Sequence, residues 1–221
     1  PTFTHQGFGE EQLIRGFDAL DVRILLADPS MHALLAVDGS PVAPDATDVE
    51  ACAAGGLPPG YTTAPDGFRG KLGEGLPPGV ADGDPLMAYT VNDTSFDVFG
   101  WQLDTPGKQA YHARLQKLAW WFIDGSASDI DVTSPRWEVF GVFTRGRRFV
   151  AYATVYTFSN PVRKSRPDSL RVCQVLVLPA YQRQGHGARL MECIYAAAIK
   201  LDAFEVTMED PAPGMSRVRP L

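Results

Sequence analysis

The sequence predicts a mixed α/β fold, and the strongest signals lie in its second half. Two runs rich in β-branched and aromatic residues, 137–144 and 148–158, are separated by a three-residue turn, which is typical of an antiparallel hairpin. A third such run, 170–178, precedes a helical apolar pattern at 188–201 and a further strand candidate at 204–208. The order strand, helix, strand predicts a parallel crossover, because parallel neighbours need such a connection.

The first half gives weaker structural signals. Between residues 38 and 84 the sequence is dense in Gly, Pro, Ala and Asp, and "LPPG" occurs twice, so long loops are expected there. Short strand candidates follow at 86–91 and 95–103. The segment 108–124 places apolar side chains on one face of a helix, which predicts an amphipathic helix packed on a core. That face consists of Tyr111, Leu115, Leu118, Ala119, Phe122 and Ile123.

Composition limits the class of protein. A chain of 221 residues with 45% hydrophobic content can bury the core of one large domain or two small ones. It contains no run of about 18 apolar residues and no basic and apolar leader, so we expect an intracellular, soluble protein. The start at Pro1 and the end at Leu221 indicate a fragment trimmed at both ends. Cys52, Cys173 and Cys193 are odd in number and lack metal-ligand spacing, which favours free thiols over disulfides or zinc.

Charge is unevenly distributed along the chain. Residues 1–100 hold 15 Asp and Glu against 4 Lys and Arg, whereas residues 101–221 hold 11 against 16, giving net charges of −11 and +5. A protein with one half facing a cationic partner and the other an anionic ligand would show this asymmetry. Two solvated surfaces of different composition are the alternative.

The stretch "YQRQGHGARL" links the third strand run to the helix that follows it. A helix beginning at 185–188 leaves its first N–H groups unpaired at the positive end of its dipole, which suits a phosphate or pyrophosphate. Gly185 and Gly187 would let such a ligand approach the backbone. The stretch lacks the Lys-Ser/Thr ending of a P-loop and contains no G-x-G-x-x-G, so neither a nucleoside triphosphatase nor a dinucleotide-binding protein is indicated.

The pattern Gln182-x-x-Gly185-x-Gly187 resembles the coenzyme A pyrophosphate loop of the GNAT acetyltransferases. Together with "FTHQGFG", "YHARLQKLAWWFID", "SRPDSLRVCQVLVLPAYQRQGHGARLMEC" and "VTMEDP", in this order, it resembles the catalytic subunits of type B histone acetyltransferases. The resemblance implies a GNAT acetyltransferase fold over residues 104–221. It also implies a smaller mixed α/β amino-terminal domain over residues 1–103, on the substrate and partner side.

The resemblance further implies acetyl-CoA as cosubstrate, with no metal. The backbone of Val175, Leu176 and Val177 would run alongside the pantetheine arm, and a backbone N–H there would polarise the thioester carbonyl. The residues implied to cradle the pyrophosphate are Gln182, Arg183, Gln184, Gly185, His186 and Gly187. Within this loop the side chain of His186 is expected to point outward, so that only its backbone N–H matters.

Acetylation of a lysine requires a base. An amine with a pKa near 10.4 is neutral in only about one molecule in 2,500 at pH 7, a cost of about 4.6 kcal/mol. A positioned carboxylate can remove the proton directly or through a water molecule. The resemblance implies this role first for Glu209, then for Asp210, and then for Asp124, where the family usually has glutamate. In the alternative interpretation, "EDP" merely ends a strand and starts a turn. Asp124 would then be only a carboxylate near a helix C-terminus, where the helix dipole disfavours a negative charge.

The resemblance implies that the substrate is the amino-terminal tail of newly synthesised histone H4, acetylated by direct attack in a ternary complex. Asp48 and Glu50 match an acidic pair that would meet tail cations, although they could be ordinary loop carboxylates. Trp137 is a candidate wall of the peptide groove, with core packing as the alternative. A thiol nucleophile is disfavoured, because Cys173 lies in a buried strand and Cys193 on a helix.

The remaining expectations concern partners and alternatives. The resemblance implies a histone-binding WD-repeat subunit as partner, no direct contact with nucleic acid or membrane, and a location in nucleus and cytoplasm. The segment after Pro211, "APGMSRVRPL", departs from the family pattern. Two other functions stay open: a GNAT enzyme acting on a small amine or a protein amino terminus, and a non-catalytic module that binds acetyl-CoA or histone.

Overall fold

The protein forms two compact units. The structure, a computed structural model, describes residues 13–123, 130–209 and 211. The amino-terminal unit comprises Pro1–Leu76 and Ala110–Asp129, and the sheet unit comprises Pro77–Gln109 and Ile130–Leu221. Helix α3 (Pro106–Phe122) begins in the sheet unit and continues in the amino-terminal unit. The functional division expected between residues 103 and 104 stays a prediction.

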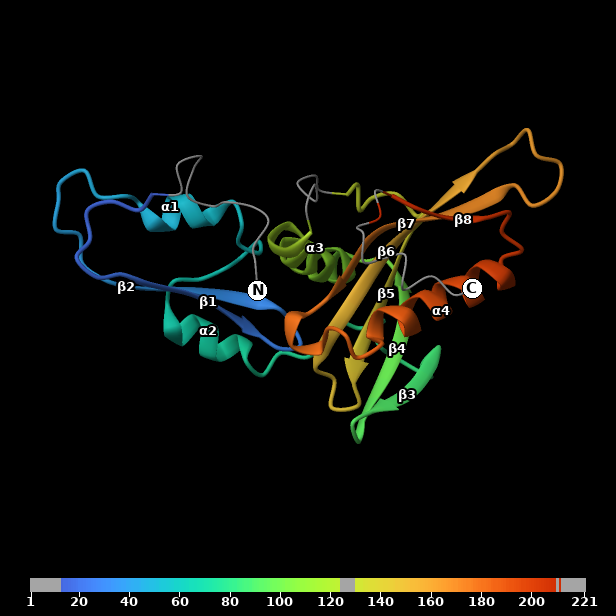
Figure 1. Cartoon of the computed structure of the whole chain (residues 1–221), viewed down its shortest axis with the longest axis horizontal. Coiled ribbons are helices and arrows are strands. Elements are labelled where there is room, and N and C mark those ends of the chain that lie inside the picture. The colour runs from blue at the N-terminus through green and yellow to red at the C-terminus, as the bar shows by residue number, and fades with distance from the viewer. Residues whose placement is uncertain (1–12, 124–129, 210, 212–221) are drawn as a thin grey trace. The chain divides into compact units, whose positions relative to one another are not determined.

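A six-stranded sheet in the order β3-β4-β5-β6-β7-β8 dominates the sheet unit (Figure 1). Its strands are β3 (Met87–Val91), β4 (Thr94–Gln102), β5 (Trp137–Thr144), β6 (Phe149–Ser159), β7 (Asp168–Val177) and β8 (Val206–Met208). Neighbouring strands are antiparallel except for β7 and β8, which are parallel. The short 3-10 turn η1 (Pro179–Tyr181) and helix α4 (His186–Lys200) connect these two. The predicted hairpin, the parallel crossover and both early strand candidates are therefore confirmed.

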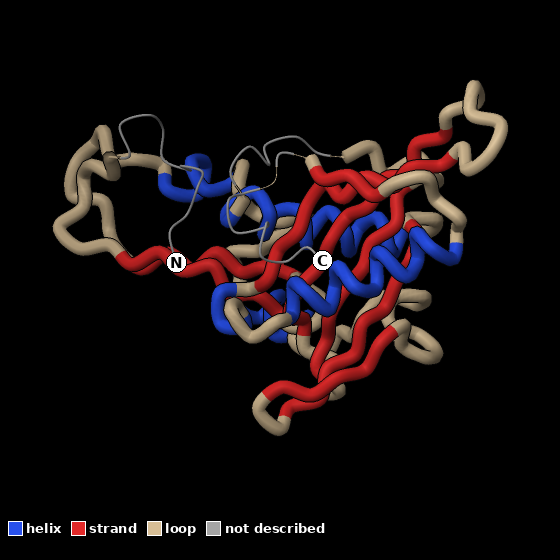
Figure 2. The backbone as a smooth tube through the Cα atoms, turned by 45° about the vertical axis from the view of Figure 1, so that its right-hand side comes forward, coloured by secondary structure: helices blue, strands red, loops and turns tan. Residues whose placement is uncertain are grey.

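Helix α4 covers one face of this sheet, as both views of the backbone show (Figures 1 and 2). Leu190, Met191 and Ile194 are completely buried in a core that they share with side chains from β4 to β7. The predicted apolar stripe of the helix is confirmed except at Leu201, which is 47% exposed. Leu201 is the C-cap residue of α4 and keeps a helical backbone, with its N–H bonded to the Ala197 carbonyl at 2.9 Å, so it lies at the very end of the covered face.

A one-residue bulge in β7 exchanges the faces of this strand. Thr154 of β6 pairs with Gln174, but the next β6 residue pairs with Val172, so Cys173 is the extra residue. Before the bulge Leu170 and Val172 belong to the core under α4, and after it Val175 and Val177 pack against the same core. One strand thus presents even-numbered and then odd-numbered side chains to a single helix.

The amino-terminal unit contains two antiparallel strands and short helices. Its elements are β1 (Asp21–Ala27), β2 (His32–Asp38), α1 (Val49–Ala54), α2 (Pro65–Lys71) and most of α3. The expectation of continuous long loops from 38 to 84 is wrong where α1 and α2 form. Their starts have local causes, because the Asp48 carboxylate accepts a hydrogen bond from the Ala51 N–H at 3.0 Å, and Pro65 is preorganised for a first helical turn.

The predicted helix is confirmed as α3, but burial is not confined to one apolar face, because His112, Arg114 and Gln116 are buried as well. Tyr111, Leu115 and Ala119 are completely buried. Two polar side chains also fix its amino-terminal-unit part: the Arg114 Nε donates to the Ser30 carbonyl at 2.7 Å, and the Trp121 Nε1 donates to a main-chain carbonyl of the α1–α2 connection at 2.8 Å. Among the described residues, no helix has both the length and the apolar character that crossing a membrane requires.

Candidate functional site: an open strand edge and a helix N-terminus

Strands β7 and β8 separate after a short pairing. Leu170 to Val172 are aligned with Val206 to Met208, and the Glu209 N–H makes one further bond to the Val172 carbonyl at 2.9 Å. Beyond this point no described residue pairs with β7 on that side. The strand therefore presents an open backbone edge from the bulge at Cys173 to its end.

The alternation of antiparallel pairing identifies which backbone groups face this edge. The Leu178 N–H donates to the Val150 carbonyl of β6, at 3.0 Å, so Leu176 and Gln174 also direct their backbone groups toward β6. Val175 and Val177 consequently direct theirs away from β6. Of the three residues predicted to run beside a pantetheine arm, these two offer main-chain groups to a ligand, whereas the Leu176 side chain is buried and its backbone turns inward.

Helix α4 begins immediately beyond this edge with an N-terminus that no side chain caps. Gly185 is the N-cap residue, and its φ of +88° lies in the left-handed region. The Arg189 N–H makes the first intrahelical bond, to the Gly185 carbonyl at 3.1 Å. The amides of the three preceding residues therefore sit at the positive end of the helix dipole. A Cβ at Gly185 would meet no atom within 4 Å, so glycine is needed there for conformation rather than for space.

The two glutamines of the loop act as internal braces. The Gln182 Nε2 donates to the Val177 carbonyl at 3.0 Å, and the Gln184 Nε2 donates to the Ala180 carbonyl at 3.1 Å. Arg183 is exposed and has a positive φ of 61°. The two glutamine side chains thus stabilise the turn, and the exposed cation beside them is available to an anionic ligand.

The side chain of His186 does not point outward, so that expectation is wrong. It is only 1% exposed, and its Nδ1 lies 2.6 Å from the hydroxyl of Tyr89. The imidazole packs among aromatic rings from β3, β4 and η1 instead of facing solvent. Sequence inspection could not find this arrangement, because Tyr89 lies 97 residues away in the chain.

Glu209 stands where β7 and β8 separate. It is exposed and directly follows β8, and the thiol of Cys173 at the bulge donates to the Arg171 carbonyl at 3.6 Å. Burial first, and then Glu209, raises the pKa of the Cys173 thiol to about 12. A thiolate nucleophile is therefore scarce at neutral pH. The other two predicted carboxylates, Asp210 and Asp124, lie outside the described residues.

A row of aromatic side chains crosses the face of the sheet opposite α4. Trp137 and Tyr156 form an edge-to-face pair with ring centroids 4.8 Å apart, and Phe158 lies 4.7 Å from Tyr156. The Arg171 guanidinium stacks on Phe158 at 4.6 Å. Trp137 is only half-buried, so core packing does not account for it fully. Tyr156 was missed by sequence reasoning, although cross-strand pairing of β5 with β6 places it directly opposite Trp137.

The predicted substrate carboxylates belong to the amino-terminal unit and already have intramolecular roles. Asp48 is the N-cap of α1, and the Glu50 Oε1 accepts a hydrogen bond from the Tyr61 hydroxyl at 3.3 Å. Both residues nevertheless lie close together at the start of one helix. A cationic peptide segment would meet two carboxylates there.

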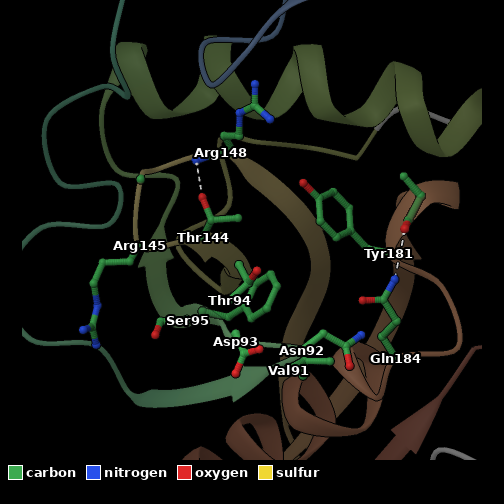
Figure 3. Close-up of a pocket in the computed structure, with 13 residues that line it drawn as sticks. Val91, Asn92, Asp93, Thr94, Ser95, Thr144, Arg145, Arg148, Tyr181 and Gln184 are labelled. Atoms are coloured by element: carbon green, nitrogen blue, oxygen red, sulfur yellow. Dashed lines mark hydrogen bonds between the residues drawn. The ribbon is translucent and has the colours of Figure 1, made fainter.

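A separate pocket of about 620 Å³ lies between the β3–β4 turn, the β5–β6 turn and the segment before α4 (Figure 3). Tyr181 and Gln184 form one side, opposite Thr144 and Arg145. Of the predicted coenzyme residues only Gln184 lines it, so this pocket is distinct from the open edge of β7. Within the described part of the chain, no group of three or more His, Cys, Asp or Glu side chains could hold a metal ion.

Two family models match the chain. The first, described as histone acetyl transferase HAT1 N-terminus, covers residues 1–124, and the second, described as acetyltransferase (GNAT) family, covers residues 97–212. Each spans more than half of the sequence. They overlap over residues 97–124, which include most of β4 and all of α3, and together they cover residues 1–212.

Curated relatives match over almost the entire chain. The histone acetyltransferase type B catalytic subunit of Mus musculus is 32% identical over 239 residues, and that of Homo sapiens is 29% identical over 239 residues. Each match covers 99% of this chain but 56% of the relative, so the chain spans about half the length of these proteins. Among solved structures, an aminoglycoside acetyltransferase from a soil metagenomic sample is 14% identical, covering 57% of this chain and 88% of that one, with a TM-score of 0.45.

Proposed function

We propose that this chain, which belongs to the acetyltransferase (GNAT) family and carries the histone acetyl transferase HAT1 N-terminus, is the catalytic part of a type B histone lysine acetyltransferase. The observation that carries the proposal is the juxtaposition of three features in the sheet unit. The open edge of β7 runs into the uncapped N-terminus of α4, and Glu209 lies where that edge begins.

The residues around the edge fit acetyl-CoA, which supplies the acetyl group as a thioester when bound. The outward N–H groups of Val175 and Val177 would pair with the amide groups of the pantetheine arm, in the manner of an added strand. The Val175 N–H, close to the bulge, would also polarise the thioester carbonyl. The amides of His186 and Gly187 at the start of α4, together with the cation of Arg183, would hold the pyrophosphate.

Glu209 would act as the general base. Its side chain is exposed at the separation of β7 and β8, where it can receive a proton from an attacking lysine amine, directly or through water. Because burial and Glu209 keep the Cys173 thiol protonated, an acyl-enzyme on Cys173 is not part of the proposal. The amine would attack the thioester directly, with both substrates bound. Asp210 and Asp124 remain candidates for a supporting role.

The proposed substrate is the amino-terminal tail of histone H4. The net charge of −11 over residues 1–100 suits a Lys- and Arg-rich guest, with Asp48 and Glu50 as local contacts. The half-buried rings of Trp137 and Tyr156 would line the approach of the lysine stem. A histone-binding WD-repeat subunit as partner, and a location in nucleus and cytoplasm, belong to the same proposal.

The test measures acetyl transfer from labelled acetyl-CoA to an H4 tail peptide, comparing the wild type with Glu209→Gln. We expect kcat to fall by about 100-fold or more, because general-base catalysis typically contributes about 10²- to 10⁴-fold. The acetyl-CoA dissociation constant should change little. Glu205→Gln is the matched control, since Glu205 is a nearby exposed glutamate that pairs with Arg163 at 3.8 Å. Unchanged turnover in Glu209→Gln would remove Glu209 from the mechanism.

Two alternatives give different outcomes in the same assay. Transfer to free polyamines but not to the peptide would indicate a GNAT enzyme for small amines. Binding of acetyl-CoA without transfer to either acceptor would indicate a non-catalytic module. The HAT1 N-terminus match over residues 1–124 favours the histone substrate over the first alternative.

A further inference from the structure

One buried titratable group has no role in the proposed chemistry although it lies inside the coenzyme loop. The imidazole of His186 is 1% exposed, and its ring centroid lies 4.5 Å from Phe96, 5.7 Å from Tyr89 and 5.9 Å from Tyr181. Its Nδ1 lies 2.6 Å from the Tyr89 hydroxyl, whereas its buried Nε2 has no hydrogen-bond partner among the described residues. A polar side chain is seldom buried this way without a reason.

We propose that His186 is a positioning residue, whose neutral imidazole anchors the loop of residues 182–187 to β3 and β4 and thereby fixes the α4 amides for the pyrophosphate. The inference rests on the proposed coenzyme-binding function of that loop. The braces from Gln182 and Gln184 both return to the segment just before the loop. The contact with Tyr89 instead reaches a strand at the far edge of the sheet.

The surroundings of the ring select one neutral form. If Nδ1 carried the proton, Nε2 would be a buried acceptor with no donor within reach. If Nε2 carries it, the Tyr89 hydroxyl donates to Nδ1, and the Nε2–H lies among aromatic faces that accept weakly. The edge-to-face arrangement with Phe96, at an interplanar angle of 61°, is compatible with such a contact. The Nε2–H tautomer is therefore the form that we assign.

The same surroundings destabilise the protonated imidazolium form of His186. Burial lowers the pKa of His186 from its ordinary value of 6.5. The Tyr89 hydroxyl contacts its Nδ1, the ring of Tyr181 packs edge-on against it, and the Arg189 guanidinium lies 5.8 Å from the Tyr89 ring. The acid of this neighbourhood, Glu192, is paired with Arg189 at 3.1 Å, and burial raises the pKa of the nearby Cys193 thiol to about 11. No unpaired anion among the described residues compensates an imidazolium.

The pH dependence follows from this sign. Above pH 6.5 the imidazole is neutral whether the loop is anchored or released, so the anchor is at full strength. As the pH falls below 6.5, the released state binds the proton more readily than the buried one. Acid therefore favours the released loop, and the affinity for acetyl-CoA falls with it.

The experiment measures the acetyl-CoA dissociation constant of the whole chain by titration calorimetry, with no histone peptide, between pH 7.5 and 5.5. Tyr89→Phe removes only the hydroxyl, and His186→Phe keeps an aromatic ring of similar bulk. At pH 7.5 we expect each variant to bind about 3- to 10-fold more weakly, the scale of one buried hydrogen bond. In acetyl transfer the KM for acetyl-CoA should rise by a similar factor, with a smaller change in kcat. The weakening by acid should disappear in His186→Phe.

Two controls separate anchoring from general destabilisation and from other histidines. Met191→Ala creates a cavity under the same helix, at a side chain that is completely buried, and should lower the Tm while leaving acetyl-CoA binding intact at low temperature. His32→Gln, in the amino-terminal unit, should retain the wild-type loss of affinity in acid. Nitrogen chemical shifts of the His186 imidazole report the tautomer directly.

The outcomes are distinct. Wild-type affinity and wild-type pH response in both Tyr89→Phe and His186→Phe would overturn the inference while leaving the proposed function intact. A proton on Nδ1 would also overturn it. If the wild type binds no acetyl-CoA at pH 7.5, the proposed coenzyme site itself fails, and the role of His186 fails with it.

Discussion

The two compact units are held together in different ways. The sheet unit has one continuous apolar core beneath α4, built from side chains of several strands and the helix. The described part of the amino-terminal unit includes two small apolar clusters, and its part of α3 is fixed, beside its buried apolar side chains, by polar side chains that reach main-chain carbonyls, Arg114 to Ser30 among them. The clusters are Ala27, Leu34 and Phe68, and Leu35, Ala53 and Leu57.

The difference in apolar packing corresponds to the different groups that each unit would contribute to the proposed function. Main-chain groups make up the proposed coenzyme site, and a continuous core holds the strand and the helix that carry them. The amino-terminal unit offers side-chain carboxylates, which tolerate a looser scaffold because charge attraction extends over several ångströms. Four substitutions test this comparison, from the largest expected effect to the smallest.

Met191→Ala should have the largest effect on stability. The side chain is completely buried in the continuous core, so its loss leaves a cavity and should cost about 2–5 kcal/mol of the free energy of unfolding. Chemical denaturation followed by circular dichroism measures this. Met191→Leu, which conserves volume, should cost under about 1.5 kcal/mol. Equal and small losses in both variants would mean that this core is less continuous than the structure indicates.

Arg114→Leu should destabilise the amino-terminal unit by about 1–3 kcal/mol, because the Ser30 carbonyl loses its buried donor at 2.7 Å. Amide hydrogen exchange should show the loss in β1 and β2 and little change in β6 and β7. Arg69→Leu is the control, since Arg69 is exposed and pairs only with Asp66 within α2. A uniform loss of protection across both units would contradict their independence.

Gly185→Ala should weaken acetyl-CoA binding by up to about 10-fold, because an L-residue at a φ of +88° costs about 1–2 kcal/mol. Gly60→Ala is the matched variant in the amino-terminal unit. Its φ is +75°, and a Cβ at either glycine meets no atom within 4 Å. Both variants should lose similar stability, yet only Gly185→Ala should lose coenzyme affinity in calorimetry. Equal affinities would place the pyrophosphate elsewhere.

The smallest effect concerns His32, which forms an ion pair with Glu74 at 3.0 Å. Burial first, and then Arg114, lowers the pKa of His32 below 6.5, although Glu74 raises it. The half-buried ring is neutral well above pH 6.5, and its protonation increasingly destabilises the fold as the pH falls below that value. Below pH 6.5, His32→Gln should therefore reduce the loss of the free energy of unfolding by under about 1 kcal/mol. Chemical denaturation at a series of pH values measures this loss. A steeper decline in the variant would reverse the sign assigned here.

Periodicity predicted the sheet unit well because its elements are long and carry clear apolar patterns. The hairpin of β5 and β6, the strand β7 and the crossover through α4 all follow from residue order alone. The amino-terminal unit was harder. Its short helices depend on single capping and N1 residues, Asp48 and Pro65, inside a segment whose composition favours turns.

The candidate site was predictable where it depends on local backbone and unpredictable where it depends on distant contacts. The helix start at His186 follows from the glycine pattern, but the inward turn of its side chain depends on Tyr89, 97 residues away. The bulge at Cys173 leaves no clear sign in the run "VCQVLVL", because valine and leucine stand at both odd and even positions there.

That extra residue decides what β7 presents to its two sides. In a regular strand of the same length, Gln174 would turn toward the helix, and Val175 and Val177 would turn toward the opposite layer. Deleting Cys173 would instead remove the bulge and leave both valines facing the helix. A β7 shortened by this one residue should therefore keep its packing beneath α4 and lose only the local kink where its edge opens.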